Sequence, residues 1–233
     1  MNKNEFIEEL KIIGIEVLNI QLEQLEIYYD MLIEYNKVMN LTGITEKEQV
    51  YLKHFYDSST LCKIIDFNDY NSLCDVGTGA GFPGIVIKIL FPKLNITLVD
   101  SLNKRIKFLN DVIEKLNLEK IECVHSRIED YAKNNRNKFD LVTARAVAPL
   151  NVLLEYCIPV LKETGFFIPM KANMNEEMDN AIKATKKINC DIIETQNFQL
   201  PIEKSNRTLI KIRKIKDNKN YPRENKEIKK NPL

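Results

Sequence analysis

The chain has 233 residues, of which 44% are hydrophobic, which is typical of one substantial globular domain with additional segments. Its 34 Lys and Arg residues nearly balance its 33 Asp and Glu residues, so no strong overall charge marks it. No apolar run approaches the roughly 18 residues of a membrane span, and the first ten residues lack a signal-type apolar core. We therefore expect a cytoplasmic protein with no membrane contact.

Residues 1–65 show helical spacing and no glycine clusters, which predicts an N-terminal helical extension of two to four helices. Apolar residues recur at intervals of three and four, as at Leu22, Leu25, Tyr29, Leu32 and Ile33. The segment "TEKEQVYLKHF" opens with a threonine and carries a glutamate three residues later, which predicts a capping box at residues 45–48.

Residues 66–215 change to short apolar runs that alternate with helical stretches. Such alternation predicts an α/β domain with a mostly parallel sheet covered by helices on both faces. Pro169 lies inside one expected strand and predicts an early end or a bulge there. Helices are expected at about 84–91, 102–117, 149–162 and 174–188, and strands at 73–76, 96–100, 121–124, 139–143, 166–170, 192–198 and 209–213.

The first expected strand runs directly into the glycine-rich segment "DVGTGAGFPG", which begins at Asp75. Glycines permit positive φ and close approach of a ligand, and the following helix offers free N–H groups, so a nucleotide-like ligand is predicted. Two patterns fit. Gly79, Gly81 and Gly84 match the G-x-G-x-x-G of dinucleotide-dependent oxidoreductases. Asp75, Gly77 and Gly79 begin a D-x-G-x-G-x-G, which resembles the first motif of class I S-adenosylmethionine-dependent methyltransferases.

Two carboxylates bear on this choice. Asp100 ends the next strand, where it is placed to accept the ribose hydroxyls that both cofactors carry, so it does not decide. Asp75 would repel an anionic pyrophosphate and attract the sulfonium and ammonium of S-adenosylmethionine, so it favours the methyl donor. The alternative, a dinucleotide-dependent oxidoreductase, lacks obvious proton-transfer groups after residue 150.

The C-terminal region is basic. Residues 204–233 hold eleven Lys and Arg against three acidic residues, and the rest of the chain holds 23 against 30. Residues 216–233 are expected to form a poorly ordered basic tail that favours a polyanionic partner. The five cysteines are odd in number and none pair as C-x-x-C, so we expect reduced thiols and no metal site.

Several longer segments resemble the ribosomal RNA small-subunit methyltransferase G family, also called glucose-inhibited division protein B. They span nearly the whole chain: "YNKVMNLTGITE" (35–46), "KHFYDS" (53–58), "CDVGTGAGFPG" (74–84), "LVDSLNKRIKFL" (98–109), "FDLVTARAVAPL" (139–150) and "YPR…PL" (221–233). The resemblance implies a class I methyltransferase fold, Rossmann-like with a seven-stranded mostly parallel sheet. It implies methylation of ring nitrogen 7 of one guanine in 16S ribosomal RNA, free or within the small ribosomal subunit, with S-adenosylmethionine as cofactor.

The resemblance also implies roles for individual residues. Gly77 and Phe82 would line the cofactor. Ile128, where the family commonly has alanine, and Glu129 would flank the adenine. Arg145 would reach the cofactor or the incoming guanine. The glycine-rich segment and the end of the next strand add Asp75, Gly79 and Asp100 to the predicted cofactor-binding residues.

The residues expected to face the substrate are consistent with methylation of guanine nitrogen 7. "TARA" at 143–146 supplies neither the Asn/Asp-Pro-Pro-aromatic turn used for exocyclic amines nor a cysteine nucleophile. Guanine nitrogen 7 has a lone pair and no proton to lose, so no general base is expected and positioning suffices. His54 is predicted to be a packed residue, and His125 a candidate for cofactor contact. Candidates for RNA contact are Lys104, Arg105, Lys107, Lys171, Arg207, Lys211, Arg213 and Arg223.

Overall fold

The computed structural model describes residues 1–174 and 177–233. Its centre is one sheet in the order β3-β2-β1-β4-β5-β7-β6, in which the strands from β3 to β5 are parallel and β7 pairs antiparallel with both neighbours. This confirms the predicted α/β class and the seven-stranded, mostly parallel sheet. The strands are β1 (Ser72–Val76), β2 (Asn95–Asp100), β3 (Ile121–His125), β4 (Phe139–Arg145), β5 (Leu161–Lys171), β6 (Cys190–Gln199) and β7 (Asn206–Lys214).

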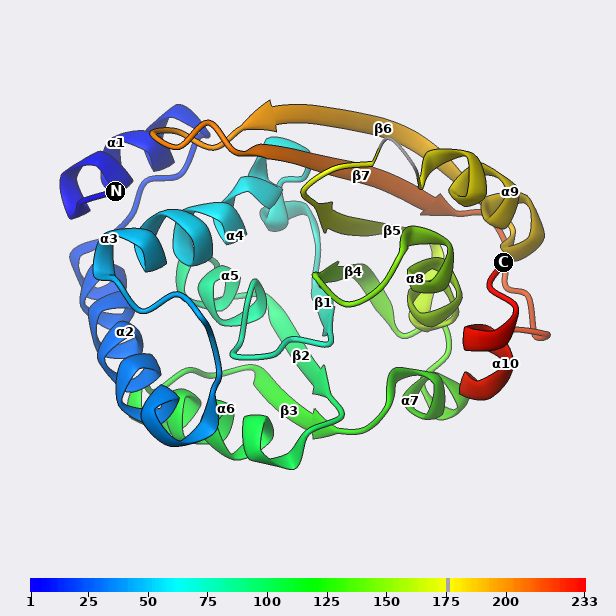
Figure 1. Ribbon diagram of the computed structural model, residues 1–233, viewed down its shortest axis with the longest axis horizontal. Helices are drawn as coiled ribbons and strands as arrows, with labels where there is room; N and C mark the ends of the chain where they lie inside the picture. The colour runs from blue at the N-terminus through cyan, green and yellow to red at the C-terminus, as the bar shows by residue number, and fades with distance from the viewer. Residues whose placement is uncertain (175–176) are drawn as a thin grey trace.

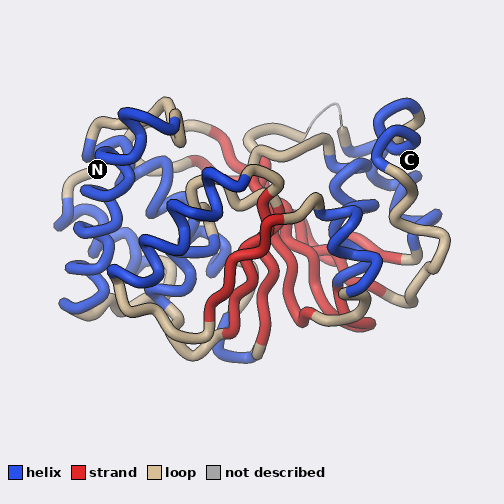
Figure 2. The backbone as a smooth tube through the Cα atoms, turned by 90° about the horizontal axis from the view of Figure 1, so that it is seen from below, coloured by secondary structure: helices blue, strands red, loops and turns tan. Residues whose placement is uncertain are grey.

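Helices cover both faces of the sheet, with the N-terminal ones on one side and the C-terminal ones on the other (Figures 1 and 2). Side chains alternate between the faces along each strand, so each face has its own apolar core. The helices are α1 (Lys3–Ile12), α2 (Asn19–Met39), α3 (Lys47–Val50), α4 (Asp57–Ser59), α5 (Gly84–Leu90), α6 (Asn103–Lys115), α7 (Ile128–Asn134), α8 (Leu150–Cys157), α9 (Met178–Ile188) and α10 (Asn225–Lys230).

The N-terminal helices pack directly against the α/β domain, where α2 contacts α5 and α6. Leu22, Leu25, Tyr28 and Leu32 are the buried apolar residues of α2, and Tyr29 is partly buried and packs against the same core. The Tyr28 hydroxyl donates to the carbonyl of Ala80 in the glycine loop, at 2.5 Å. The extension therefore supports the loop from behind.

Three local predictions were wrong. Glu46, not Thr45, precedes α3, and no side chain caps that helix. The helix expected over 149–162 ends at Cys157 and gives way to a 3₁₀ turn at Ile158–Val160, because Pro159 cannot continue it. Strand β5 continues through Pro169 without a bulge, although the proline and Ile168 make no pairing with β7.

The other differences concern short helices and the tail. Helix α7 was not predicted, since seven residues give too little periodicity. The helix expected from 174 begins at Met178, and residues 175 and 176 lie outside the described part of the chain. The expectation of a poorly ordered tail was wrong: Ile228 of α10 is fully buried, and α10 lies beside α7 and α8 in Figure 1.

All five cysteines are free, as predicted. Among the described residues, no helix is long and apolar enough to cross a membrane. Within the same residues, no group of three or more His, Cys, Asp or Glu side chains is arranged to hold a metal ion.

Candidate functional site

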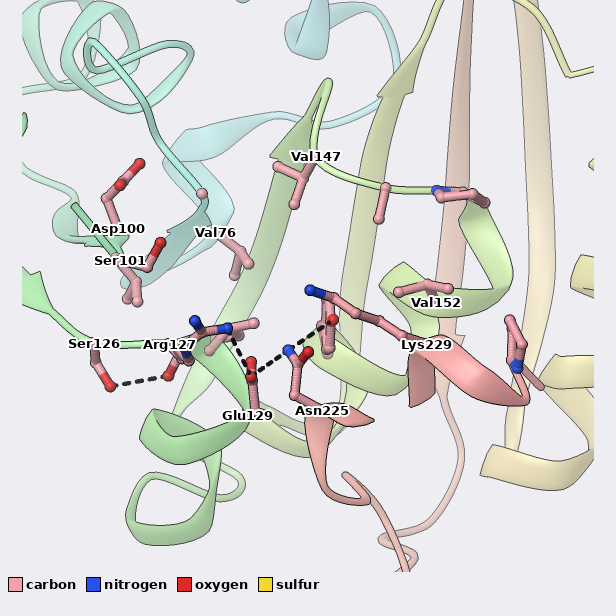
Figure 3. A pocket seen from close by; sticks show the side chains of 17 residues that line it. Val76, Asp100, Ser101, Ser126, Arg127, Glu129, Val147, Val152, Asn225 and Lys229 are labelled. Carbon is pink, nitrogen blue, oxygen red and sulfur yellow. Dashed lines mark hydrogen bonds and ion pairs between the residues drawn. The ribbon is translucent and has the colours of Figure 1, made fainter. Parts of the chain in front are cut away.

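A cavity of about 500 Å³ opens at the carboxyl ends of β1, β2 and β4, and we call it the first cavity (Figure 3). Four of the predicted cofactor-binding residues line it: Gly77, Asp100, Ile128 and Glu129. The carboxyl edge of a parallel sheet is the usual place for a ligand, because neighbouring strands send their loops apart there. The first cavity is therefore the candidate cofactor site.

The backbone conformation of the glycine loop requires glycine at the carboxyl edge of the sheet. Gly77 has φ +67°, and a Cβ added there would lie 2.6 Å from a methyl carbon of Val147. Gly79 also has a positive φ, of +63°, but nothing crowds it, and its N–H donates to the Asp100 carboxylate at 2.9 Å. The loop is thus tied to the end of β2. Gly77 lines the first cavity, whereas Gly79 does not.

Asp100 is almost fully buried and already accepts several hydrogen bonds. Its Oδ1 accepts from the N–H of Leu102 at 2.9 Å, and its Oδ2 accepts from Gly79 and from Arg105 at 3.2 Å. A carboxylate accepts about four hydrogen bonds, so Oδ1 retains room for one further donor. This free position fits one hydroxyl of a ribose.

Asp75 does not line the first cavity, because strand alternation turns it to the opposite face from Val76, which does. Its Oδ2 accepts from the Thr78 hydroxyl at 2.7 Å and from the N–H of Gly84 at 2.8 Å. Its Oδ1 is buried and has no hydrogen-bond partner. Burial raises the pKa of Asp75 to about 6. The carboxylate therefore anchors the loop from beneath, and its direct contact with a cofactor stays a prediction.

Glu129 is 3% exposed on the floor of the first cavity, next to Ile128. It accepts a hydrogen bond from the side-chain amide of Asn225, and its carboxylate lies 3.9 Å from Arg127. Figure 3 shows Asn225 pointing to Glu129 from α10, a segment far away in the sequence.

A second cavity of about 590 Å³ lies beyond the end of β4. Arg145 and Ala146 line this second cavity, whereas Val147 and Ala148 line the first. Ala146 has a φ of +56° at the crossing point, a conformation that costs a non-glycine residue about 1 kcal/mol. The two cavities are thus neighbours separated by one strained turn.

Arg145 belongs to the second cavity and not to the first. Its Nη1 donates to the carbonyl of Lys53 and to Asp57 Oδ2, both at 3.1 Å. Asp57 Oδ1 accepts from Arg207 Nε at 2.7 Å, so one carboxylate holds two arginines. The Asp57 side chain is 5% exposed and the two arginines 15% and 18%, so the cluster is largely shielded from water.

Phe82 and His54 form the flat wall behind this cluster. Their rings stack with centroids 4.4 Å apart, and the Arg145 guanidinium lies 5.2 Å from the Phe82 ring centroid. Burial, with a contribution from the Arg145 charge, lowers the pKa of His54 to about 3. His54 is therefore a packed neutral residue, as predicted. Phe82 lines neither cavity, and it packs behind His54 and Arg145, which line the second.

Comparison with known proteins identifies the chain. A family model described as rRNA small subunit methyltransferase G, named GidB, matches residues 21–210. The chain belongs to this family. The ribosomal RNA small subunit methyltransferase G of Bacillus subtilis is 49% identical over all of this chain and 99% of its own length. The protein of that name from Lysinibacillus sphaericus is 48% identical over 96% of this chain and 95% of its own.

Solved structures at low identity agree on the fold. A SAM-dependent methyltransferase from Aquifex aeolicus superposes with a TM-score of 0.53 at 16% identity, over 72% of this chain and 93% of its own. M. jannaschii TYW2 in complex with AdoMet gives 0.52 at 13%, over 63% and 70%. Nothing in these comparisons supports the oxidoreductase alternative, and the family membership favours methyl transfer.

Several residues of this family member were missed as site residues. Asp57 and Thr42 fall inside the quoted segments "KHFYDS" and "YNKVMNLTGITE", but neither was given a role. The Thr42 hydroxyl lies 2.8 Å from His54 Nε2, so the N-terminal extension contributes to the second cavity. Those segments were the available signal. Asn225 lies within the span of the segment "YPR…PL" (221–233), but nothing in the sequence pairs it with Glu129, which is 96 residues away.

Other expectations about this family member change as well. His125 does not line the first cavity, and its ring nitrogen contacts the carbonyl of Ser101 at 3.1 Å. Half of the candidate RNA-contacting cations are already engaged by carboxylates within the chain. These pairs are Arg105 with Asp100, Lys171 with Glu177, Arg207 with Asp57, and Arg223 with Glu155.

Proposed function

We propose that this chain transfers a methyl group from S-adenosylmethionine to ring nitrogen 7 of a guanine in 16S ribosomal RNA. The observation that carries the proposal is the family match over residues 21–210, joined to full-length relatives named for methylation of the small-subunit ribosomal RNA. The substrate would be the RNA itself or the small ribosomal subunit, and it would be met in the cytoplasm.

The first cavity suits the cofactor, whose sulfonium supplies an activated methyl group. Asp100 keeps one free acceptor position for a ribose hydroxyl, and Ile128 and Glu129 would bound the adenine. The bare backbone at Gly77 would lie along the amino-acid part. The buried carboxylate of Asp75, with one unpartnered oxygen, adds negative charge beneath the loop, which favours a cationic ligand over a pyrophosphate.

The second cavity suits the guanine. Arg145 presents five N–H groups, and its hydrogen bonds to other described residues are made by its two terminal nitrogens. Arginine is a common partner of the guanine edge, and a donor placed on oxygen 6 leaves nitrogen 7 free to react. Asp57 holds Arg145 in place from one side, and the Phe82 ring supports it from below.

The lining of the second cavity contains no free general base among the described residues. His54 is neutral, and both ring nitrogens are engaged, with Thr42 and with Arg145. The carboxylates of Asp57 and Glu177 are both paired with cations. Nitrogen 7 needs no base because it loses no proton, so the cavity must only orient the ring and exclude water.

The direct test uses the full chain, S-adenosylmethionine with a labelled methyl group, and small subunits from cells that lack this protein. We expect label in 16S RNA at one guanine, detected as a strand break after borohydride and aniline treatment, which cleave at N7-methylguanine. Label on an exocyclic amine, or none in 16S RNA, would overturn the proposal. Calorimetry should show binding of S-adenosylmethionine and none of NAD.

A further inference from the structure

The segment that follows β7 lies beyond the part of the chain matched by the family model, which ends at residue 210. It nevertheless forms one wall of the first cavity through Asn225, Lys229 and Pro232. In Figure 3 Asn225 and Lys229 enter the cavity from α10, on the side opposite Asp100 at the end of β2. The basic tail therefore meets the cofactor site and not only solvent.

Buried and charge-assisted contacts hold this wall against the body of the protein. Arg223 donates through its backbone N–H and its guanidinium to the fully buried carboxylate of Glu155, at 2.7–2.8 Å. Ile228 is fully buried in the core under α8. Arg136 pairs with Asp217 at 2.8 Å at the start of the segment. The wall is thus fixed at several points, which favours a structural role in the cavity over a free RNA-binding arm.

The contact that matters most joins the wall to Glu129. The Asn225 amide nitrogen donates to Glu129 Oε1, and it also lies 3.3 Å from the Tyr156 hydroxyl. Arg127 is a charged neighbour of Glu129, but it is 3.9 Å away and its side chain is 60% exposed. The hydrogen bond from Asn225 therefore constrains the orientation of the buried carboxylate, and it engages Oε1 and not Oε2.

We propose that residues 222–233 form a permanent wall of the cofactor cavity, and that Asn225 is a positioning residue that orients Glu129 toward the nucleoside of the methyl donor. The inference rests on the proposed function in one respect: it takes S-adenosylmethionine as the occupant. It changes the role expected for the tail, because loss of the tail would remove cofactor affinity as well as positive charge.

The test measures S-adenosylmethionine affinity by calorimetry on full-length variants, with thermal unfolding of the same samples without ligand. Asn225→Asp places a second carboxylate against Glu129 and should weaken binding by at least about tenfold, since like charges in a shielded site repel strongly. Asn225→Ala should weaken it a few-fold. Lys226→Ala, on the exposed face of the same helix and outside the cavity, is the matched control and should bind like wild type.

A double variant separates positioning from mere stability. Glu129→Gln with Asn225→Asp exchanges donor and acceptor, so the hydrogen bond and the wall are restored while the carboxylate leaves the cofactor side. We expect its melting temperature to return to the wild-type value while the affinity stays weak. Wild-type affinity in N225D, or in the double variant, would overturn the inference. A wild-type chain that binds no S-adenosylmethionine would instead overturn the proposed function.

Discussion

The two cavities differ in charge and in the way the sequence builds them. The first is bounded by segments that directly follow β1, β2, β3 and β4 and by the C-terminal segment, and its buried charged groups are the carboxylates of Asp100 and Glu129. The cations Arg127 and Lys229 also line it, but both are exposed. The second gathers Lys53, Arg145, Lys171 and Arg207 from the N-terminal helices, β4, β5 and β7. A cavity whose buried charges are carboxylates, beside one with an excess of basic groups, suits a cationic donor beside a polyanionic acceptor, and the strained turn at Ala146 divides them.

The largest effect is expected at the second cavity. Arg145→Lys keeps the charge beside Asp57 but loses the planar fork of donors, so single-turnover methyl transfer should fall by about a hundredfold. S-adenosylmethionine affinity should stay within a few-fold of wild type, because Arg145 does not line the first cavity. Arg213→Lys, an exposed position that lines neither cavity, serves as the control. Equal losses of cofactor affinity and rate would show that the two cavities are not separate in function.

The next largest effect is expected at the first cavity. Asp100→Asn removes the charge-assisted acceptor at the end of β2 and should weaken S-adenosylmethionine binding by about ten- to a hundredfold. Calorimetry checks this directly. Asp111→Asn on α6, whose carboxylate contacts Tyr35 on the exposed surface, makes the same chemical change and should have no effect. Unchanged affinity in D100N would remove Asp100 from the cofactor site.

The affinity for S-adenosylmethionine should also depend on pH, which tests whether the charge of Asp75 contributes to cofactor binding. Because the pKa of Asp75 is raised to about 6, its carboxylate becomes charged only as the pH passes that value. If that charge attracts the sulfonium, affinity should rise about tenfold from pH 5 to pH 8, and Asp75→Asn should flatten the curve. Calorimetry across this range is the measurement, and the same slope in D75N would assign it to another group.

The effect of the same group on stability has the opposite sign. A carboxyl whose folded pKa lies above its unfolded value of about 3.8 binds its proton more tightly in the folded state. Its contribution to the free energy of unfolding is therefore present below about pH 4 and is lost as the pH rises through 6. Urea denaturation of wild type and D75N across this range should show the difference.

The smallest expected effect concerns the glycine loop. Gly77→Ala forces a non-glycine residue into φ +67° and places its Cβ 2.6 Å from Val147, so the unfolding free energy should fall by about 1–3 kcal/mol. Adding Val147→Ala should recover only the part due to the clash. Gly43→Ala, with no atom within 4 Å and no positive φ, is the control for urea denaturation. A stable G77A would mean that the loop relaxes easily.

The first cavity could largely be predicted because its parts lie in the order in which the strands occur. Gly77, Asp100, Ile128 and Glu129 all follow successive strand ends, and the carboxyl ends of parallel strands meet at one edge. Asp75 does not line this cavity, for a reason visible in the sequence pattern. The strand alternation that sends Val76 toward the cavity must send Asp75 to the other face.

The second cavity and the tail wall could not be predicted in the same way. Asp57 contacts Arg145 and Arg207 across 88 and 150 residues, and Asn225 contacts Glu129 across 96. Local periodicity carries no information on such pairs, which depend on how helices dock on the finished sheet. The tail was misjudged because its lysine-rich composition hides the few residues, Arg223 and Ile228 above all, that anchor it.

A crystal structure of the full chain with S-adenosylmethionine tests the account most directly. The account predicts that the donor occupies the first cavity, with its ribose on Asp100, its adenine between Ile128 and Glu129, and its methyl group facing the second cavity at Arg145. A donor bound elsewhere, or one whose methyl group points away from Arg145, would contradict the division into a cofactor cavity and a guanine cavity.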